Sequence, residues 1–370
     1  MQSARNRFTG LRTTFQGQLR KTFFGSSVQS GASLTRDIGI DRLSIKIQDR
    51  RRPLWFVFSG LGSQCNEVPK ELWSFEPFGN SIQESRVTLR NLGIDLDPLL
   101  RRSNDLIFKD IRSAFACSSS LQLALYETLR ATFVTEPSGF IGHSAGEVLC
   151  GYADGCLTAE QVLVISDMRG RAMHEGRLEQ GAMAAVGMSW NDLQNQCPDN
   201  VYAACNNAAE NVTVSGSLGP VLSFVEELQR KGIFAKLVDS CNYSPHSPLA
   251  IPAGNLFRKY LEGVVPNEKA RSHKWVCTSA KESNWNLRDV SHCSEEYFVR
   301  NFLEPVWFYE ATLHIPNNAV VVEVSPKSIF QGVLKQTVPK DCTNFVPVLR
   351  DGTLNPILSS EGCSRLISAF

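Results

Sequence analysis

The stretch FIGHSAGEV, residues 140–148, places one serine between two glycines where an apolar run gives way to an acidic residue. The apolar run predicts a buried strand and Glu147 marks the start of a helix, so Ser144 stands in a tight strand-to-helix turn. Such a G-x-S-x-G turn strains the serine backbone and leaves no room for side chains at Gly142 and Gly146. It presents Ser144 Oγ beside the N–H groups of the helix start, which face any oxyanion that develops. The alternative is a glycine-rich turn with a capping serine.

Ser144 needs a base, because a hydroxyl is a weak nucleophile until its proton is accepted. The chain has six histidines. His143 is expected to face away from the serine and to pack or hydrogen-bond elsewhere. His246, in the proline-restrained segment NYSPHSPLA, is the candidate base. Because this histidine follows the serine in the chain, the residue order of trypsin-like proteases is excluded.

Strands and helices alternate along the chain. The run LWFVF, residues 54–58, ends at a glycine turn and predicts a buried parallel strand. Apolar residues at helical spacing predict a helix over 107–132 that leads into a strand at 133–141. Further elements are predicted as a helix over 159–176, a strand at Trp275–Ser279, a helix near 294–302 and a strand at 320–326.

Between residues 179 and 243 the segments become short and predict a small βαββαβ unit inserted in a larger domain. The fold class is therefore α/β, with a large α/β-hydrolase-like subdomain on a parallel sheet and an inserted small ferredoxin-like subdomain. The predicted division is a basic leader or linker at 1–52, the large subdomain at 53–178 and 244–370, and the small subdomain at 179–243.

Composition narrows the class of protein. The 370 residues are 42% hydrophobic and 20% charged, which is typical of a globular enzyme. The net charge of +1 gives no overall field to attract nucleic acid or an anionic membrane, and no apolar run approaches the 18 to 20 residues of a membrane span. The eleven cysteines show no CxxC or metal-ligand spacing, so a reduced, cytoplasmic chain without a metal is expected.

The first 36 residues carry six basic residues, and no acidic residue precedes Asp37. This composition is typical of a mitochondrial transit peptide, which makes mitochondria the alternative location. A disordered leader or an interdomain linker is the favoured interpretation.

Eight ordered motifs resemble the malonyl/acetyl acyltransferase domain of animal-type (type I) multifunctional fatty acid synthase, over about residues 53–370. The phrases GYADGCL and AMAAVG favour the animal synthase over stand-alone bacterial or mitochondrial malonyl transferases. The motifs are FSGLGSQ (58–64), GHSAGEV (142–148), GYADGCLT (151–158), MRGRAM (168–173), GAMAAVGMSW (181–190), CNNAAENVTVSG (205–216), FAKLVDSCNYSPHS (234–247) and VVVEVSPKSIFQGVLK (320–335).

By this resemblance Ser144 takes the acyl group from coenzyme A as an ester. His246 acts as the general base and then as the acid for the leaving thiol. Backbone carbonyls orient this histidine in the family, so no aspartate is assigned. Arg169 matches the arginine that holds the free carboxylate of the malonyl group, and the planar fork of a guanidinium fits a carboxylate.

The resemblance also implies an oxyanion hole and a substrate pocket. The hole is formed by the backbone N–H groups of Leu61 and Ala145, and losing one such donor typically costs about 100- to 1000-fold in rate. The residues predicted to contact substrate, besides Arg169, are Gln64, Gln122, Asn207, Tyr243 and Pro245.

Two positions depart from the family pattern. Pro245 stands where animal synthases usually have a bulky aromatic residue, and Tyr-Ser-Pro-His-Ser is closer to the Tyr-Ala-Ser-His-Ser of polyketide transferases that accept methylmalonyl units. The missing ring leaves room for an α-methyl branch, worth about 1 to 3 kcal/mol of discrimination, so methylmalonyl-CoA is a predicted substrate. Cys65 stands where an aromatic residue is common and puts the geometry of the substrate entrance in question.

The resemblance implies no bound cofactor, because a thioester is already activated toward acyl transfer. Malonyl-CoA and acetyl-CoA are the expected donors, and the phosphopantetheine thiol of an acyl carrier protein is the expected acceptor. No ketosynthase or carrier domain is recognisable, so these partners are expected on another polypeptide or elsewhere in a multidomain synthase. Two alternatives remain. A serine hydrolase or thioesterase has no standing need for Arg169, and an inactive scaffold has no need to retain Ser144 and His246.

Overall fold

The computed structural model describes residues 52–62, 68–101, 110–132, 136–325, 327–347 and 355. The chain divides into two units, Met1–Arg50 and Arg51–Phe370, and every described residue belongs to the second. All of the predicted leader except Arg52 lies outside the described residues.

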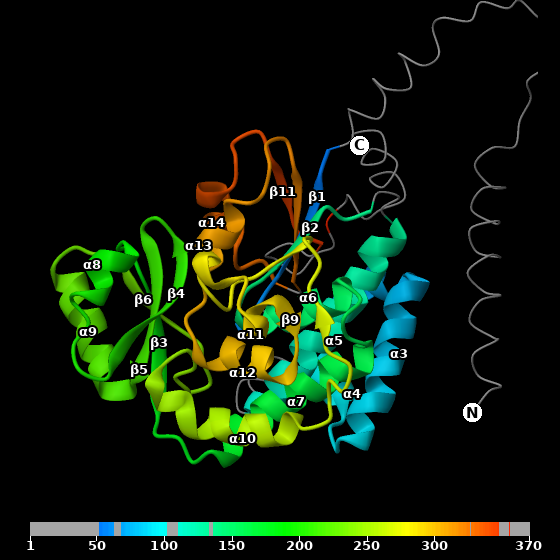
Figure 1. The fold of residues 1–370 in the computed structure, drawn as a ribbon, viewed down its shortest axis with the longest axis horizontal. Coiled ribbons are helices and arrows are strands. Elements are labelled where there is room, and N and C mark those ends of the chain that lie inside the picture. Colours follow the sequence, from blue (N-terminus) through cyan, green and yellow to red (C-terminus); the bar gives the residue numbers. More distant parts are fainter. Residues whose placement is uncertain are drawn as a thin grey trace, which may run out of the picture. The chain divides into compact units, whose positions relative to one another are not determined.

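The large lobe is built on a parallel sheet, which in the described part of the chain has five strands in the order β11-β10-β1-β2-β8. In Figure 1 the sheet is seen almost along its edge, with β1 in blue. Because all neighbours are parallel, the carboxyl ends of the strands lie at one edge of the sheet, which is where ligands bind in open α/β sheets. The strands are β1 (Leu54–Phe58), β2 (Gly139–Gly142), β8 (Trp275–Val276), β10 (Val320–Val324) and β11 (Thr343–Phe345).

Both faces of the sheet are buried. This explains why all five residues of β1 are apolar. Leu54, Phe56 and Phe58 point into the larger core, while Trp55 and Val57 point into a second core on the opposite face. Alternate side chains of a strand point to opposite faces, so a strand between two cores must be apolar throughout.

Helices cover the two faces unequally. The larger core is covered by α3 (Glu76–Asn91), α4 (Leu96–Arg101), α5 (Ile111–Thr132), α6 (Glu147–Ala153), α7 (Ala159–Glu175), α10 (Ile251–Leu261) and α12 (Glu295–Leu303). Figure 1 shows α3, α5 and α7 gathered on this side, and α5 packs against both of the others. The second core is covered by α13 (Phe308–Thr312) and α14 (Gln331–Thr337).

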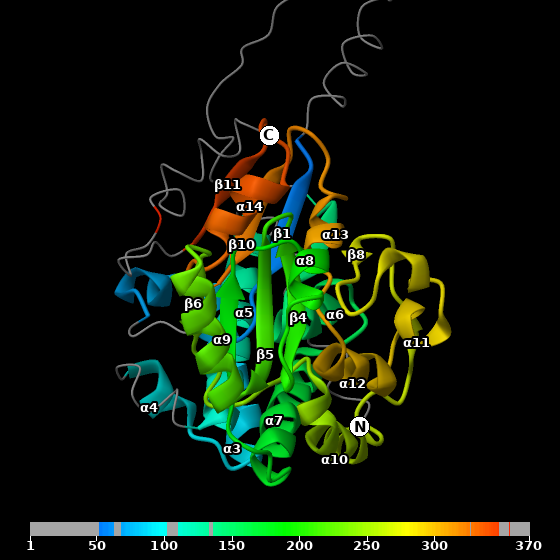
Figure 2. The same cartoon turned by 90° about the vertical axis from the view of Figure 1, so that its left-hand side faces the viewer.

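The small lobe follows the predicted βαββαβ order. Its elements are β3 (Gly181–Val186), α8 (Trp190–Gln194), β4 (Val201–Ala208), β5 (Asn211–Ser217), α9 (Leu218–Arg230) and β6 (Ala235–Val238). The strands pair antiparallel in the order β4-β5-β3-β6, which is the ferredoxin-like order. Figure 2 looks onto this lobe, with α8 and α9 in front of the strands. The predicted fold class is confirmed.

The two lobes are joined through β4. Asn206 donates its N–H to the Val306 carbonyl at 2.8 Å, and Val306 donates to the Ala204 carbonyl at 2.8 Å. Ala204 and Cys205 also pack in the second core of the large lobe. The small sheet is therefore hydrogen-bonded to the segment that follows α12.

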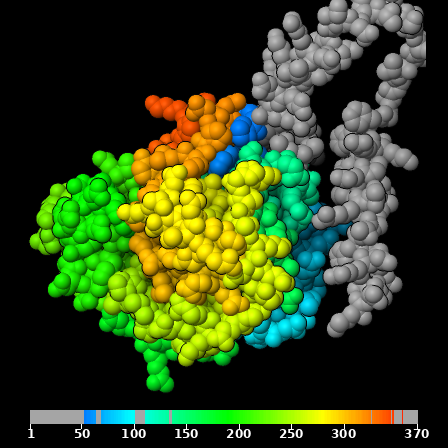
Figure 3. Space-filling view, viewed as in Figure 1, coloured from blue at the N-terminus to red at the C-terminus, as the bar shows by residue number. Residues whose placement is uncertain are grey.

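Short elements complete the described structure. They are η1 (Lys70–Ser74), η2 (Ser144–Gly146), η3 (Pro248–Ala250), β7 (Lys269–Ala270), η4 (Glu282–Asn284), α11 (Arg288–Ser291) and β9 (His292–Cys293). Figure 3 shows the yellow chain that contains β7, η4 and α11 covering the middle of that face, beside the green small lobe. Within the described residues, no helix combines the length and the apolar character needed to cross a bilayer.

The strand predicted at Trp275–Ser279 is shorter in the structure, because β8 ends at Val276. The Thr278 N–H donates instead to the Glu147 carboxylate at 2.9 Å, and the Ser279 hydroxyl donates to the same carboxylate. These two residues therefore leave the sheet to bind a buried charge.

The serine turn lies against the end of β1. The His143 N–H donates to the Phe58 carbonyl at 2.9 Å. A Cβ at Gly146 would collide with that same carbonyl and would lie 2.7 Å from the Ser59 carbonyl oxygen, and a Cβ at Gly142 would collide with the Glu147 backbone. Both glycines are needed because backbone, which cannot rotate away, occupies the space a side chain would take.

We expect Gly146→Ala to lower the free energy of unfolding by about 1 to 3 kcal/mol, because the added methyl forces the turn away from β1. Urea unfolding measures the change. Gly79→Ala in α3 is the matched control, since a Cβ there has no atom within 4 Å and alanine favours a helix. Equal stability of the two variants would contradict the prediction.

Candidate active site

Ser144 and His246 meet at the carboxyl edge of the parallel sheet. Ser144 follows β2 with a φ of 54°, the strained conformation expected of this turn. Its Oγ lies 2.7 Å from His246 Nε2, although the residues are 102 positions apart. A hydroxyl and an imidazole at this distance form a nucleophile–base pair.

A backbone carbonyl orients the imidazole. His246 Nδ1 lies 2.9 Å from the Glu304 carbonyl oxygen, and the His246 N–H donates to the Phe302 carbonyl at 3.2 Å. Because a carbonyl only accepts, Nδ1 carries the hydrogen and Nε2 keeps the lone pair that accepts from Ser144. No side-chain carboxylate of the described residues contacts this ring.

Burial keeps His246 neutral. The ring is 2% exposed, and its burial, followed by the positive charge of Arg169, lowers the pKa of His246 to about 3. At neutral pH the imidazole is therefore in the form that can take a proton from Ser144.

Arg169 brings a buried positive charge to the nucleophile. The side chain comes from α7, is 2% exposed and has its Nη2 3.4 Å from Ser144 Oγ. It lies over the rings of Phe302 and Phe115, with Cζ 5.0 and 5.6 Å from their centroids. Burial lowers the pKa of Arg169 to about 9, so the guanidinium stays protonated at neutral pH.

The Arg169 guanidinium is incompletely paired. Nη1 donates to Asn301 Oδ1 at 2.5 Å, whereas the buried Nε has no hydrogen-bond partner among the described residues. No carboxylate of the described residues forms an ion pair with it. A buried cation with an unused donor costs free energy unless a ligand completes its contacts, and a carboxylate is the ligand that fits its fork.

The loop after β1 is pressed against the turn. A Cβ at Gly60 would lie 2.8 Å from the His143 carbonyl oxygen and 3.2 Å from Ser144 Cβ. Leu61 is the next residue of this loop, and Ala145 follows the serine within η2. Their predicted function in an oxyanion hole concerns the backbone alone, so either side chain is free to vary.

Gln122 supports this loop from below. Its Oε1 accepts the Ser59 N–H at 2.9 Å, and its Nε2 donates to the Ser59 carbonyl at 3.0 Å and to Ser118 Oγ at 3.1 Å. The amide is 1% exposed and is occupied by these bonds. The structure thus gives Gln122 a positioning function, and direct contact with substrate stays a prediction.

Asn207 joins the lobes through His143. Its Oδ1 lies 2.9 Å from His143 Nε2, and its Nδ2 donates to Thr213 Oγ1 at 3.0 Å. The His143 ring packs against both Phe308 and Phe330, and burial lowers the pKa of His143 to about 4. His143 therefore points away from Ser144, and Asn207 reaches the site through this ring.

Tyr243 and Pro245 lie on the segment that leads from β6 into His246. Both are half-buried, and Tyr243 packs against the larger core. Burial raises the pKa of Tyr243. Their contacts with substrate stay predictions. Gln64 and Cys65 lie outside the described residues.

The sequence reasoning missed Asn301, Glu304 and a structural function for Glu147. Asn301 is a polar residue on the buried face of α12, between the apolar residues Phe298 and Phe302. That position was the available signal. The sequence gives no signal for the Glu304 carbonyl, because every residue type has a backbone carbonyl.

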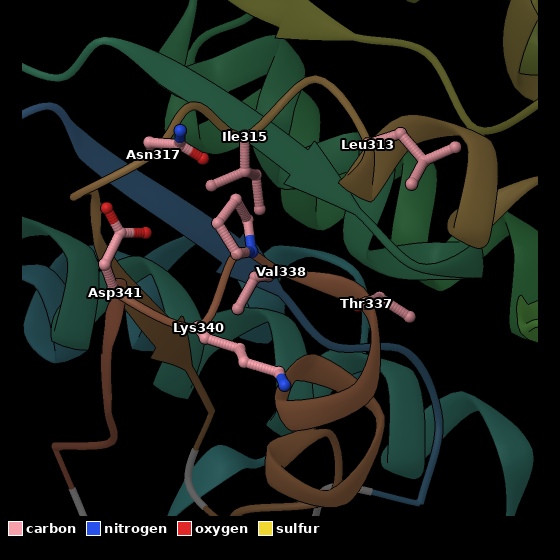
Figure 4. Close-up of a pocket in the computed structure, with 8 residues that line it drawn as sticks. Leu313, Ile315, Asn317, Thr337, Val338, Lys340 and Asp341 are labelled. Carbon is pink, nitrogen blue, oxygen red and sulfur yellow. The ribbon is translucent and has the colours of Figure 1, made fainter.

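The described surface also has hollows away from Ser144. One of about 550 Å³, shown in Figure 4, is lined by Leu313, Ile315, Asn317 and residues 337–341. These residues precede β10 and β11, at the amino ends of the strands. The chemistry of Ser144 lies at the carboxyl ends, so this hollow is separate from the site. Within the described residues, no group of three or more His, Cys, Asp or Glu side chains is placed to hold a metal ion.

The acyl transferase domain family matches residues 55–358, which is most of the chain. This chain belongs to that family. The acyltransferase has its serine, histidine and arginine together in one site of the large lobe.

Known proteins and solved structures are similar to this chain in sequence and in fold. The acyltransferase is 29% identical over 318 residues to the highly reducing polyketide synthase PKS2 of Leptosphaeria maculans, covering 78% of this chain but 12% of that protein. Its fold is similar to the acyltransferase domain of the polyketide synthase PpsC of Mycobacterium tuberculosis (TM-score 0.69, 22% identity, 80% of this chain and 90% of that one). It is also similar to the malonyl CoA-acyl carrier protein transacylase of Coxiella burnetii (TM-score 0.71, 19% identity, 86% and 98%).

The pKa of His246 predicts the pH dependence of Ser144 reactivity. Only the neutral ring accepts the proton, and its pKa is lowered from 6.5 to about 3, so lowering the pH through 6.5 leaves the base form intact. We expect the rate of labelling by a fluorophosphonate probe to change less than about twofold between pH 8 and 5.5, whereas an ordinary histidine would lose about 90% of it.

Ser144→Ala is the control for site-specific labelling, and circular dichroism at each pH checks that the protein stays folded. A labelling rate that falls as the pH drops through 6.5 would contradict the prediction.

Proposed function

We propose that this acyltransferase moves malonyl and acetyl groups from coenzyme A to the phosphopantetheine thiol of an acyl carrier protein through an ester on Ser144. The observation that carries the proposal is the contact of one hydroxyl with both a neutral imidazole and a buried, incompletely paired guanidinium. The imidazole supplies a base, and the guanidinium supplies a place for a substrate carboxylate.

In the first half-reaction His246 Nε2 accepts the proton of Ser144 Oγ as the oxygen attacks the thioester carbon. The negative charge passes to the thioester oxygen, which the backbone N–H groups of Leu61 and Ala145 receive. The carbon–sulfur bond then breaks, His246 gives its proton to the coenzyme A sulfur, and an acyl-serine remains.

The second half-reaction reverses the roles. The phosphopantetheine thiol gives its proton to His246 and attacks the ester carbon. Ser144 Oγ leaves and regains the proton from His246, so no proton is gained or lost overall. The Glu304 carbonyl holds the ring in the same tautomer for both halves.

Arg169 distinguishes the donors. Its guanidinium sits close enough to Ser144 Oγ that the free carboxylate of a malonyl ester lies within reach, while an acetyl ester has no group for it. This feature also favours a transferase of carboxylate-bearing groups over a general serine hydrolase.

The name of the Coxiella burnetii neighbour supports the donor and acceptor classes. The sequence motifs resemble those of an animal-type fatty acid synthase, whereas the curated relatives of this chain are polyketide synthases. Both pathways need this transfer, and the chain spans about 12% of the length of those relatives. A carrier protein is the partner that the transfer requires, and a ketosynthase is the expected neighbouring domain of the same synthase.

Intact-mass analysis tests the ester directly. We expect a short incubation with malonyl-CoA or acetyl-CoA to add the mass of the corresponding acyl group to the protein and an acyl carrier protein to remove it. Ser144→Ala should gain no mass. Loss of the added group to water as fast as to the carrier would indicate a hydrolase instead.

Replacing Arg169 tests the carboxylate contact. We expect Arg169→Ala to lower kcat/KM for malonyl-CoA by about 10- to 100-fold, the usual range for a lost charged hydrogen bond, with a much smaller effect on acetyl-CoA. Arg171→Ala is the matched control, since Arg171 lies on the same helix, is exposed and pairs with Glu175. Equal losses for both donors would contradict the proposal.

Replacing Pro245 tests whether the enzyme accepts a methylmalonyl group as well as a malonyl group. We expect the enzyme to accept methylmalonyl-CoA, and Pro245→Phe to reduce that activity by about 10-fold or more while sparing malonyl-CoA, because a ring adjacent to His246 fills the space of the branch. Competition between the two donors measures the preference. A wild-type preference for malonyl above about a thousandfold would overturn this part of the proposal.

A further inference from the structure

We propose that Asn301 and Glu147 act as a positioning relay that fixes the Arg169 guanidinium and so sets the preference for acyl groups with a free carboxylate. The inference rests on the proposed function, because it concerns how Arg169 is held for its substrate. Neither residue is expected to touch the acyl group.

Asn301 connects the guanidinium to the nucleophile turn. Its Oδ1 accepts from Arg169 Nη1 at 2.5 Å, and its Nδ2 donates to the Ser144 carbonyl at 3.0 Å. The same Nδ2 lies 3.1 Å from Glu147 Oε2 and 3.0 Å from Ser279 Oγ. The side chain is 1% exposed, so water does not compete for these bonds.

Glu147 fixes which way this amide faces. A flipped amide would place Oδ1 against the Glu147 carboxylate and the NH2 group against the Arg169 guanidinium, two repulsive contacts in a buried site. The observed orientation satisfies both charges. Asn301 therefore has one allowed orientation, and its oxygen must point at Arg169.

The Glu147 carboxylate itself cannot move. It is 0% exposed and lies three residues after Ser144 at the start of α6. Its Oε1 accepts from the Trp275 indole at 3.2 Å, the Thr278 N–H at 2.9 Å and the Tyr297 hydroxyl. Its Oε2 accepts from Thr278 Oγ1 at 3.1 Å and from the Ser279 hydroxyl, in addition to Asn301. A buried carboxylate with this many donors is held rigidly.

The amide between the two charges has a functional consequence. The negative charge of Glu147 opposes the fall in the pKa of Arg169 that burial causes, so the cation persists. A direct ion pair would occupy the donor fork with a protein carboxylate. Placing Asn301 between them uses one nitrogen only, and it leaves Nε and the face toward Ser144 for the substrate.

The test compares malonyl-CoA and acetyl-CoA on the same preparation of each variant. We expect Asn301→Ala, which releases the guanidinium, to lower the ratio of kcat/KM for malonyl to that for acetyl by about 10-fold. Asn301→Ser keeps a small polar group at this position but is too short to reach Arg169, so it should lower the same ratio even if the alanine variant does not fold. Asn191→Ala, an exposed position on α8, is the control and should leave the ratio unchanged.

A merely structural function would lower both activities together, and an unchanged ratio in the folded Asn301 variants overturns the relay. Arg169→Ala separates this failure from that of the proposed function. If Arg169→Ala lowers the malonyl-to-acetyl ratio of kcat/KM while the Asn301 variants leave it unchanged, only the relay is wrong. If Arg169→Ala leaves the ratio unchanged, or the wild-type protein forms neither ester, the proposed function fails and the relay fails with it.

Discussion

The close approach of the serine turn to the end of β1 is the constraint on which the site depends. The Phe58 carbonyl accepts the His143 N–H, and the space beside it admits only glycine at position 146. Gly60 of the following loop also lies against the turn, so close backbone packing holds this loop beside Ser144. Gln122 of α5 holds the loop through two hydrogen bonds to the Ser59 backbone, and Glu147 at the other end of the turn is hydrogen-bonded to Asn301.

Burial determines the charge states of the site. It lowers the pKa of His246 and of His143, which keeps both imidazoles neutral, while Arg169 remains a cation. A dry site strengthens every electrostatic contact within it and makes an unused guanidinium donor costly. A substrate carboxylate relieves that cost, so the same burial that prepares the base also prepares the place for the acyl group.

Much of the architecture could be predicted from local patterns. The apolar run at 54–58 became the central strand, and the short segments at 179–243 became the ferredoxin-like lobe. Predicted edges failed where tertiary contacts override local preference: β8 stops at Val276 because Thr278 and Ser279 turn to bind Glu147. Single residues whose value lies in a backbone carbonyl, such as Glu304, leave no trace in sequence.

The sequence by itself determined the strand–serine turn–helix unit, the alternation that makes an α/β fold, and the identity of Ser144, His246 and Arg169 as the residues to examine. The turn and the alternation follow from nearest-neighbour sterics and side-chain periodicity, which act over a few residues. The choice of His246 also drew on its proline-restrained setting and on the resemblance to known acyltransferases, and that of Arg169 on the resemblance alone. The tertiary structure alone decided that the imidazole meets the hydroxyl at 2.7 Å, that Asn301 rather than a carboxylate holds Arg169, and that Glu147 is buried beneath both. Such contacts join residues more than a hundred positions apart, and only the packing of the large lobe and the dielectric of its interior fix them.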